Sequence, residues 1–103
     1  MWVLTDHEGR SVRVTMERLD HLQEHPEMQD LETEVQETIR SPQVVIAARD
    51  PGVRRYYRLI QATRVGAKLL CVVVEVGEVD AFLLTAYLTD SIKRGAQLWP
   101  RRT

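Results

Sequence analysis

The dominant hydrophobic pattern of the chain lies in residues 67–88, where two apolar segments flank a short polar break. The β-branched run at 72–74 favours a buried strand, and Gly77 followed by Glu78 predicts a tight reversal. The second segment alternates, with Phe82, Leu84, Ala86 and Leu88 predicted on one face and Leu83, Thr85 and Tyr87 on the other. We therefore predict a long central hairpin whose apolar surface the rest of the chain has to cover.

Shorter segments on the N-terminal side predict further strands. Residues 2–14 predict a small hairpin. Residues 43–48 and 54–60 predict two strands joined by a turn at 49–52, followed by a loop at 61–66. Side chains of the second strand alternate between its two faces. One face is predicted to hold Arg55, Tyr57 and Leu59, and the other Arg54, Tyr56, Arg58 and Ile60. Together with the central hairpin, these strands predict an antiparallel meander.

Two helices are predicted between the first hairpin and the meander. Thr15 is suited to cap a helix that ends near Glu24. Pro26 is tolerated at the start of a helix but not inside one, so it begins a second helix. That helix has an apolar stripe at spacings of three and four, and Ser41-Pro42 ends it after Ile39.

The order of these elements predicts an α+β fold. An N-terminal hairpin and two helices precede a four-stranded antiparallel β-sheet meander, and a last helical turn at 91–94 ends at Gly95. Helices that are segregated from a meander pack against one of its faces. The length of 103 residues gives room for a single domain, 1–103, with one core.

The composition is typical of a soluble globular protein. Apolar residues make up 44% of the chain and charged residues 28%, which is ordinary for this class. No apolar run approaches the roughly 20 residues that span a bilayer, and the charged N-terminus shows no signal peptide. We therefore expect a cytoplasmic protein without membrane contact. The single Cys71 lies in the strongest strand and is expected to be a buried, inert thiol without a disulfide.

The charge is distributed unevenly along the chain. Residues 1–40 hold ten acids and four bases, a balance of −6, and residues 41–103 hold five acids and ten bases, a balance of +5. The predicted helices are therefore acidic and the predicted sheet is basic. A basic sheet face is suited to contact phosphates. It is equally consistent with a solvated face whose charge the acidic helices neutralise.

Histidines are the first candidates for chemistry. His21 and His25 are four residues apart, a spacing at which two imidazoles of one helix share a metal. Pro26 interrupts that helix and no nearby cysteine or further histidine supplies the remaining ligands, so we expect no metal. His25 is also consistent with a helix-capping or core residue, or with a general acid or base, because imidazole titrates near neutral pH. His7 falls in a predicted turn and is expected to be exposed.

Hydroxyl and cationic side chains on the predicted sheet form a second group of candidates. The Tyr-Tyr-Arg run at 56–58 suits RNA, with a guanidinium on phosphate and a ring against a base, but it also suits an ordinary strand. Thr85 and Tyr87 place two hydroxyls on one side of an apolar strand, and Lys93 follows at the same end. The sequence contains no phosphate-cradling glycine loop and no zinc-binding cysteine spacing. No cofactor is expected.

Seven short segments, taken in order, carry a resemblance to a known family. They are His21-Leu-Gln-Glu-His-Pro-Glu-Met28, Glu37-Thr-Ile-Arg-Ser-Pro42, Arg55-Tyr-Tyr-Arg58, Leu70-Cys-Val-Val-Val74, Leu84-Thr-Ala-Tyr-Leu-Thr89, Ile92-Lys-Arg-Gly95 and Leu98-Trp99. The chain resembles the phage-associated branch of the barnase–EndoU–colicin–RelE superfamily, the BECR fold, of metal-independent ribonucleases. The resemblance implies two N-terminal helices on a four-stranded antiparallel sheet, with the active site on the open sheet face.

The resemblance implies catalytic roles for seven side chains: His25, His21, Arg58, Tyr57, Thr85, Tyr87 and Lys93. The imidazole of His25, or that of His21, is the expected general acid or base. Arg58 with Lys93 is expected to stabilise charge on the phosphate, a tyrosine to position or protonate, and Thr85 to bind the phosphate. RNA supplies its own nucleophile, the 2′-hydroxyl. Tyr57 and Arg58 point to opposite faces of a regular strand, so both serve only if a bulge intervenes.

The expected function is that of a small metal-independent endoribonuclease, a toxin of phage or bacterial conflict acting on RNA. The alternatives are a non-catalytic module of the same fold that binds RNA or protein, and an assembly protein whose acidic helices form a homodimer. An antitoxin or immunity protein is expected to dock on the basic sheet face. The nuclease hypothesis requires an imidazole from the helices to lie beside Thr85 and Tyr87, near a guanidinium.

Overall fold

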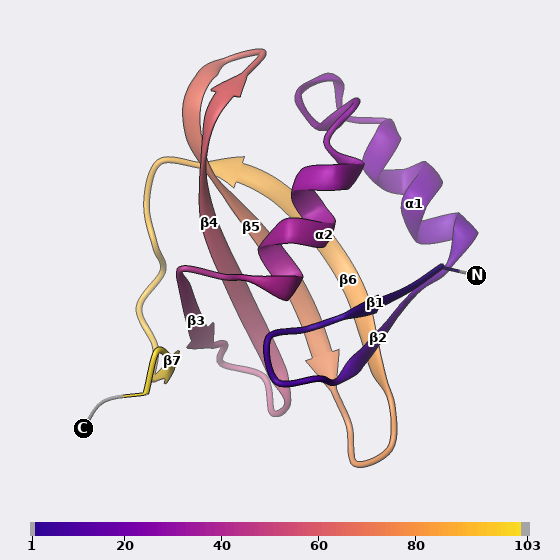
Figure 1. The fold of residues 1–103 in the computed structure, drawn as a ribbon, viewed down its shortest axis with the longest axis vertical. Helices are drawn as coiled ribbons and strands as arrows, with labels where there is room; N and C mark the ends of the chain where they lie inside the picture. The colour runs from indigo at the N-terminus through magenta and orange to yellow at the C-terminus, as the bar shows by residue number, and fades with distance from the viewer. Residues whose placement is uncertain (1, 102–103) are drawn as a thin grey trace.

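The computed structural model describes residues 2–101, and this part of the chain forms one mixed sheet of seven strands. The strands are β1 (Trp2–Thr5), β2 (Ser11–Val14), β3 (Val44–Ala47), β4 (Val53–Thr63), β5 (Gly66–Val76), β6 (Ala81–Thr89) and β7 (Gln97–Trp99). They lie in the order β1-β2-β6-β5-β4-β3-β7, with β2 and β6 parallel and the other neighbours antiparallel. Figure 1 shows the long strands β4, β5 and β6 at the centre.

The predicted four-stranded antiparallel sheet is wrong, because three more strands extend it on both sides. Arg13 of β2 pairs in parallel with Phe82 of β6, and Trp99 of β7 pairs with Val45 of β3. Strands β6 and β3 are the outer strands of the predicted meander, and an outer strand offers unpaired N–H and C=O groups to any neighbouring strand. The hydrophobic pattern predicts strands one by one, but it does not say which edges they extend.

The helical layer consists of α1 (Met16–Gln23), the 3-10 turn η1 (Pro26–Met28) and α2 (Glu32–Arg40). Thr15 caps α1 as predicted, its Oγ1 accepting the backbone N–H of Arg18 at 3.1 Å. A continuous second helix from Pro26 is wrong, because η1 stops after three residues and Asp30 has a φ of 65°. No helix in residues 2–101 is long and apolar enough to cross a membrane.

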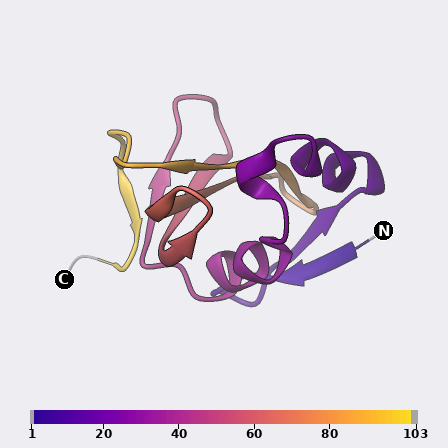
Figure 2. The ribbon, with the colours of Figure 1, turned by 90° about the horizontal axis from the view of Figure 1, so that it is seen from above.

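The two faces of the sheet have different covers. On the helix face, the helical layer and the first hairpin bury the main core, which includes Val12, Leu22, Met28, Val35, Ile39, Val45, Tyr56, Leu70, Val72, Val74, Leu83 and Ala86. The opposite face, which we call the open face, holds a smaller cluster around Ile46, Tyr57 and Cys71. Figure 2 shows the helices on one side of the molecule and the C-terminal segment on the other.

A β-bulge in β6 changes the predicted faces of that strand. Val73 of β5 pairs with Thr85, whereas the next residue, Val74, pairs with Leu83. The extra residue between them, Leu84, shifts the alternation. Leu83 therefore joins Ala86 in the main core, and the prediction that they face opposite ways is wrong.

Two connections also differ from the sequence predictions. The predicted loop at 61–66 is mostly strand, because β4 continues to Thr63 and β5 begins at Gly66. The predicted helical turn at 91–94 is irregular backbone. We call residues 90–96 the C-terminal strap, which leads from β6 to β7 along one edge of the molecule (Figure 1). A Cβ on Gly95 would overlap the carbonyl oxygen of Ala47, so only glycine lets the strap approach β3 this closely.

Candidate nucleic-acid interface

The open face brings three of the sequence-predicted site residues together. Tyr57, Cys71 and Tyr87 are direct cross-strand partners on β4, β5 and β6. In the next row, Arg55 and Thr85 flank Val73 in the same way. Direct cross-strand partners on one face lie within about 5.5 Å of each other at Cβ, so these side chains form one compact patch.

The C-terminal strap adds Lys93 to this patch. The backbone N–H of Lys93 donates to the hydroxyl oxygen of Tyr57 at 3.1 Å, and its Nζ lies 5.9 Å from the centre of the Tyr87 ring. A salt bridge between Lys68 and Asp90, at 2.7 Å, joins the start of the strap to β5. We call the group of Arg55, Tyr57, Thr85, Tyr87 and Lys93 the open-face site.

The protic groups at the centre of the open-face site keep their protons at neutral pH. Burial raises the pKa of Tyr57 and of Cys71, and burial together with the neighbouring Cys71 raises the pKa of Tyr87 to about 12. The positive charge of Arg55 opposes the rise in pKa at all three groups. The site thus combines cations with hydroxyl donors, an arrangement suited to an anion.

Arg58 lies on the other face and has a structural task. Its Nη1 donates to the carbonyl oxygen of Ser41 at 2.7 Å, directly after α2. The pairing of β4 with β5 is regular from Val53 to Ile60, so no bulge brings Arg58 to the side of Tyr57. Of the two, Tyr57 alone contributes to the open-face site.

The two candidate histidines of the helical layer are also on the helix-face side. His21 is exposed, with Nδ1 3.5 Å from a carboxylate oxygen of Glu24, and its ring centre lies 6.1 Å from that of the exposed His25. The sheet separates this layer from Thr85 and Tyr87. The structure therefore does not bring either imidazole to the hydroxyls, as the histidine-based mechanism requires.

A second polar cluster, which the sequence did not single out, lies in the turn between β1 and β2. Asp6 is 3% exposed, and its carboxylate accepts the backbone N–H groups of Glu8 and Arg10, the guanidinium of Arg10 at 2.7 Å and the hydroxyl of Tyr56 at 2.9 Å. Burial alone would raise the pKa of Asp6, but these donors outweigh it and the pKa is lowered. An ionised, fully paired carboxylate therefore ties the turn to β4.

The side chain of His7 is buried beside this carboxylate, and its predicted exposure is wrong. Its side chain is 6% exposed, with its ring centre 5.6 Å from that of Tyr56 and 4.8 Å from that of Trp99. Burial lowers the pKa of His7, and the negative charges of Asp6 and Glu8 offset only part of this effect. The imidazole is therefore neutral at pH 7 and joins the N-terminal turn to β4 and β7.

The same turn contains the one group of three potential metal ligands in residues 2–101. Ligand atoms of Asp6, His7 and Glu8 lie within 4.8 Å of one another. However, Asp6 is already paired with Arg10, and both Arg10 and Arg54 have a guanidinium nitrogen within 3.5 Å of Glu8. These positive charges repel a cation. We interpret the group as an ion-pair network.

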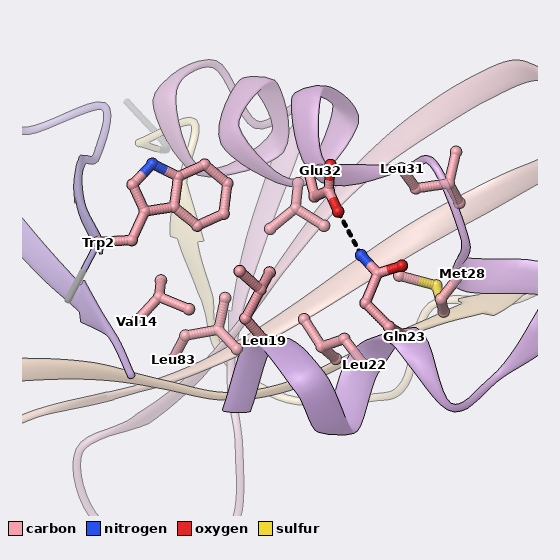
Figure 3. Close-up of a pocket in the computed structure, with 10 residues that line it drawn as sticks. Trp2, Val14, Leu19, Leu22, Gln23, Met28, Leu31, Glu32 and Leu83 are labelled. Atoms are coloured by element: carbon pink, nitrogen blue, oxygen red, sulfur yellow. Dashed lines mark hydrogen bonds between the residues drawn. The ribbon is translucent and has the colours of Figure 1, made fainter. Parts of the chain in front are cut away.

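An apolar pocket between the helical layer and the sheet is a third candidate (Figure 3). Trp2, Leu19, Met28 and Leu83 are among its lining residues, and a hydrogen bond between Gln23 and Glu32 crosses it. The cavity measures about 10 Å³, which is room for no more than one water molecule. This pocket is part of the packed core.

The sequence reasoning missed the roles of three residues, Arg55, Asp6 and His7, for two different reasons. Arg55 carried a usable signal, because it lies two residues before Tyr57 and so shares its face. Asp6 and His7 carried none, since polar residues of a hairpin turn are normally exposed. Their burial depends on Tyr56 and Trp99, which are distant in the sequence.

Comparison with models of protein families, with curated proteins and with solved structures finds no match to this chain. A fold by itself does not determine a function, so the functional evidence lies in the open-face site and in the turn between β1 and β2.

Proposed function

We propose that the open-face site binds the sugar–phosphate backbone of single-stranded RNA. The observation that carries this proposal is the convergence of Arg55, Thr85, Tyr87 and Lys93 on a sheet face that the helices leave uncovered. The two cations neutralise phosphates, the hydroxyls donate to phosphate oxygens, and the partly exposed ring of Tyr87 offers a surface to a base. The sequence resemblance to metal-independent ribonucleases supports RNA as the polymer.

The binding proposal is tested with a labelled single-stranded RNA in a chelating buffer at several salt concentrations, followed by fluorescence anisotropy. Arg55→Gln and Lys93→Gln are each expected to weaken binding about tenfold, because each removes one charge-assisted contact, and to reduce the slope of log affinity against log salt by about 1. Arg18→Gln on α1 removes the same charge on the far side and is the matched control. Equal affinities for Arg55→Gln and Arg18→Gln would contradict the proposal.

RNA cleavage is a second candidate, favoured by the position of Tyr87, whose ring centre lies 5.9 Å from Nζ of Lys93. A hydroxyl with a pKa of about 12 keeps its proton at neutral pH and can donate it to the leaving 5′-oxygen. The attacking 2′-hydroxyl belongs to the RNA, and Arg55 and Lys93 stabilise the charge on the phosphate. The five residues of the open-face site include no ionised proton acceptor. Binding is therefore the function that the geometry supports best.

Cleavage is tested by the products, which are expected to carry 2′,3′-cyclic phosphate ends. A substrate with one 2′-deoxy position is expected to bind equally and to resist cleavage at that position. Tyr87→Phe is expected to lower the cleavage rate by about 100-fold, the lower range for a general acid. Because it keeps the ring and removes one hydroxyl contact, it is expected to weaken RNA affinity by no more than about tenfold. If the wild-type protein binds RNA and leaves it intact, the cleavage candidate fails and the binding proposal stands.

The sequence-based hypotheses about partners stay predictions. A toxin role, an inhibitory protein on the basic sheet face and a homodimer all concern molecules outside the single chain. The open-face site sharpens one of them, because an inhibitor that covers Lys93 would block the proposed RNA contact.

A further inference from the structure

Three arginines from separate parts of the chain converge on Glu8, in the turn between β1 and β2. Arg54 Nη1 and Arg10 Nη1 lie 3.4 Å and 3.5 Å from Oε1 of Glu8, and Arg101 Nη2 lies 3.7 Å from Oε2. Arg54 belongs to β4 and Arg101 follows β7. The turn, the central sheet and the residues after β7 thus meet at one carboxylate.

The contacts between Glu8 and these three guanidiniums are long for charge-assisted hydrogen bonds. Charge-assisted N–H···O hydrogen bonds measure about 2.7–2.9 Å, and the neighbouring pair of Arg10 and Asp6 reaches 2.7 Å. The three contacts to Glu8 are all longer. Its side chain is also 33% exposed, so moving it into water sacrifices little burial. The guanidiniums therefore have donor capacity that Glu8 does not use.

The local charge favours an anion more strongly charged than a carboxylate. The three guanidiniums face the two carboxylates of Asp6 and Glu8, which leaves one positive charge with Glu8 in place and two when it moves out. His7 Nε2 lies 3.6 Å from Oε1 of Glu8, whereas the buried Nδ1 has no partner in the described structure. A neutral imidazole carries one proton, which we place on Nε2 because that nitrogen faces an acceptor. It is a fourth donor.

We propose that Glu8 occupies a binding site for a phosphate monoester dianion or inorganic phosphate. When Glu8 moves into water, the phosphate binds between Arg10, Arg54 and Arg101, whose planar donor groups match its oxygens. Asp6 stays paired with Arg10 and Tyr56 and holds the site in shape. This site is distinct from the open-face site and does not depend on the RNA proposal.

The test is a titration of the full chain with inorganic phosphate, balanced with chloride to constant ionic strength and followed by NMR of arginine side-chain and backbone N–H groups. Saturable shifts are expected at Arg54 and in the turn. Glu8→Gln is expected to bind phosphate about tenfold tighter, because it removes the competing charge. Arg54→Gln, and separately the exposed Arg101→Gln, are expected to bind it more weakly. Glu24→Gln on the helical layer makes the same charge change and is the matched control.

The proposal is overturned if Glu8→Gln binds phosphate no more tightly than Glu24→Gln, or if both arginine variants bind it as the wild type does. A second arm compares RNA oligonucleotides that carry a 5′-phosphate or a 5′-hydroxyl. Tighter binding of the phosphorylated strand, lost in Arg54→Gln, identifies a nucleic-acid end as the source, whereas response to inorganic phosphate alone identifies free phosphate. Lys93→Gln is expected to keep the phosphate shifts, which separates this result from failure of the open-face site.

Discussion

Tyr56 and Tyr57 are neighbours in β4, both are almost fully buried, and they lie on opposite faces of the sheet. The hydroxyl of Tyr56 donates to the buried carboxylate of Asp6. The same carboxylate also accepts the guanidinium of Arg10 and two backbone N–H groups. The hydroxyl of Tyr57 accepts the backbone N–H of Lys93, at the border of a site open to solvent. One strand thus supplies the same side chain twice, once to fix the fold and once to position a candidate site.

The largest effect is expected from the buried network. Asp6→Ala leaves the Tyr56 hydroxyl and two backbone N–H groups without an acceptor and removes the shorter ion pair of Arg10. It is expected to lower the free energy of unfolding by about 3–5 kcal/mol. Asp90→Ala, which breaks the exposed pair with Lys68, is expected to cost less than about 1 kcal/mol. Urea unfolding measures both. Similar losses for the two variants would contradict a stabilising role for the network.

The next largest effect is expected in the C-terminal strap, which carries Lys93 of the open-face site. Gly95→Ala forces a Cβ against the backbone of Ala47 and is expected to cost about 1–3 kcal/mol, as overpacking does. Ser91→Ala changes the C-terminal strap without this conflict and is expected to stay within about 0.5 kcal/mol. The displaced strap should also shift the NMR signal of the Lys93 amide. If that signal is unchanged, Gly95 does not position Lys93.

The two tyrosines provide the most direct comparison. Tyr56→Phe removes a hydrogen bond to a buried charge and is expected to cost about 2 kcal/mol. Tyr57→Phe removes a neutral bond to an amide that water can reach and is expected to cost about 0.5–1 kcal/mol. Only the second variant should alter RNA affinity. Equal costs, measured by urea unfolding, would mean that the two faces are not specialised as described.

The smallest effect is expected in the pH dependence of stability. Because the pKa of His7 is lowered in the folded state, the unfolded chain takes up a proton below its ordinary value of 6.5 while the folded chain does not. The free energy of unfolding therefore falls as the pH falls through 6.5 toward the folded-state value. His7→Gln should flatten this slope between pH 7.5 and 5.5, whereas the exposed His21→Gln should keep it. The contribution of Asp6, whose lowered pKa starts from 3.8, appears only at lower pH.

The sequence predicted the local elements well where a periodic pattern met a clear end signal. The cap at Thr15, the strand β3 and the faces of β4 follow from residues that are neighbours in the chain. The start of α2 was misplaced because Pro26 permits both an α-helix and a 3-10 turn. In the structure, Asp30 has a left-handed backbone conformation and Leu31 packs into the main core. The preference of proline for the first turn of a helix predicts neither feature.

The candidate site was predictable in part, for the same reason. Thr85 and Tyr87 were recognised because alternation puts them on one side of a strand, and the structure brings Tyr57 and Lys93 to them. The placement of the two helix histidines depends on which sheet face the helices cover, and a hydrophobic pattern does not fix this choice. The burial of Asp6 and His7 depends on contacts with Tyr56 and Trp99, so no local pattern contains it.

The position of the C-terminal strap has a consequence for the order in which the protein is made. Ribosomes add residues from the N-terminus onward. A chain that has emerged only as far as Thr89 already holds Tyr57, Thr85 and Tyr87, but it lacks Lys93 and the strand that anchors it to β3. The cationic surface beside Tyr87 is thus completed only after β4, β5 and β6 have been made, and a chain that stops before Lys93 lacks the full open-face site.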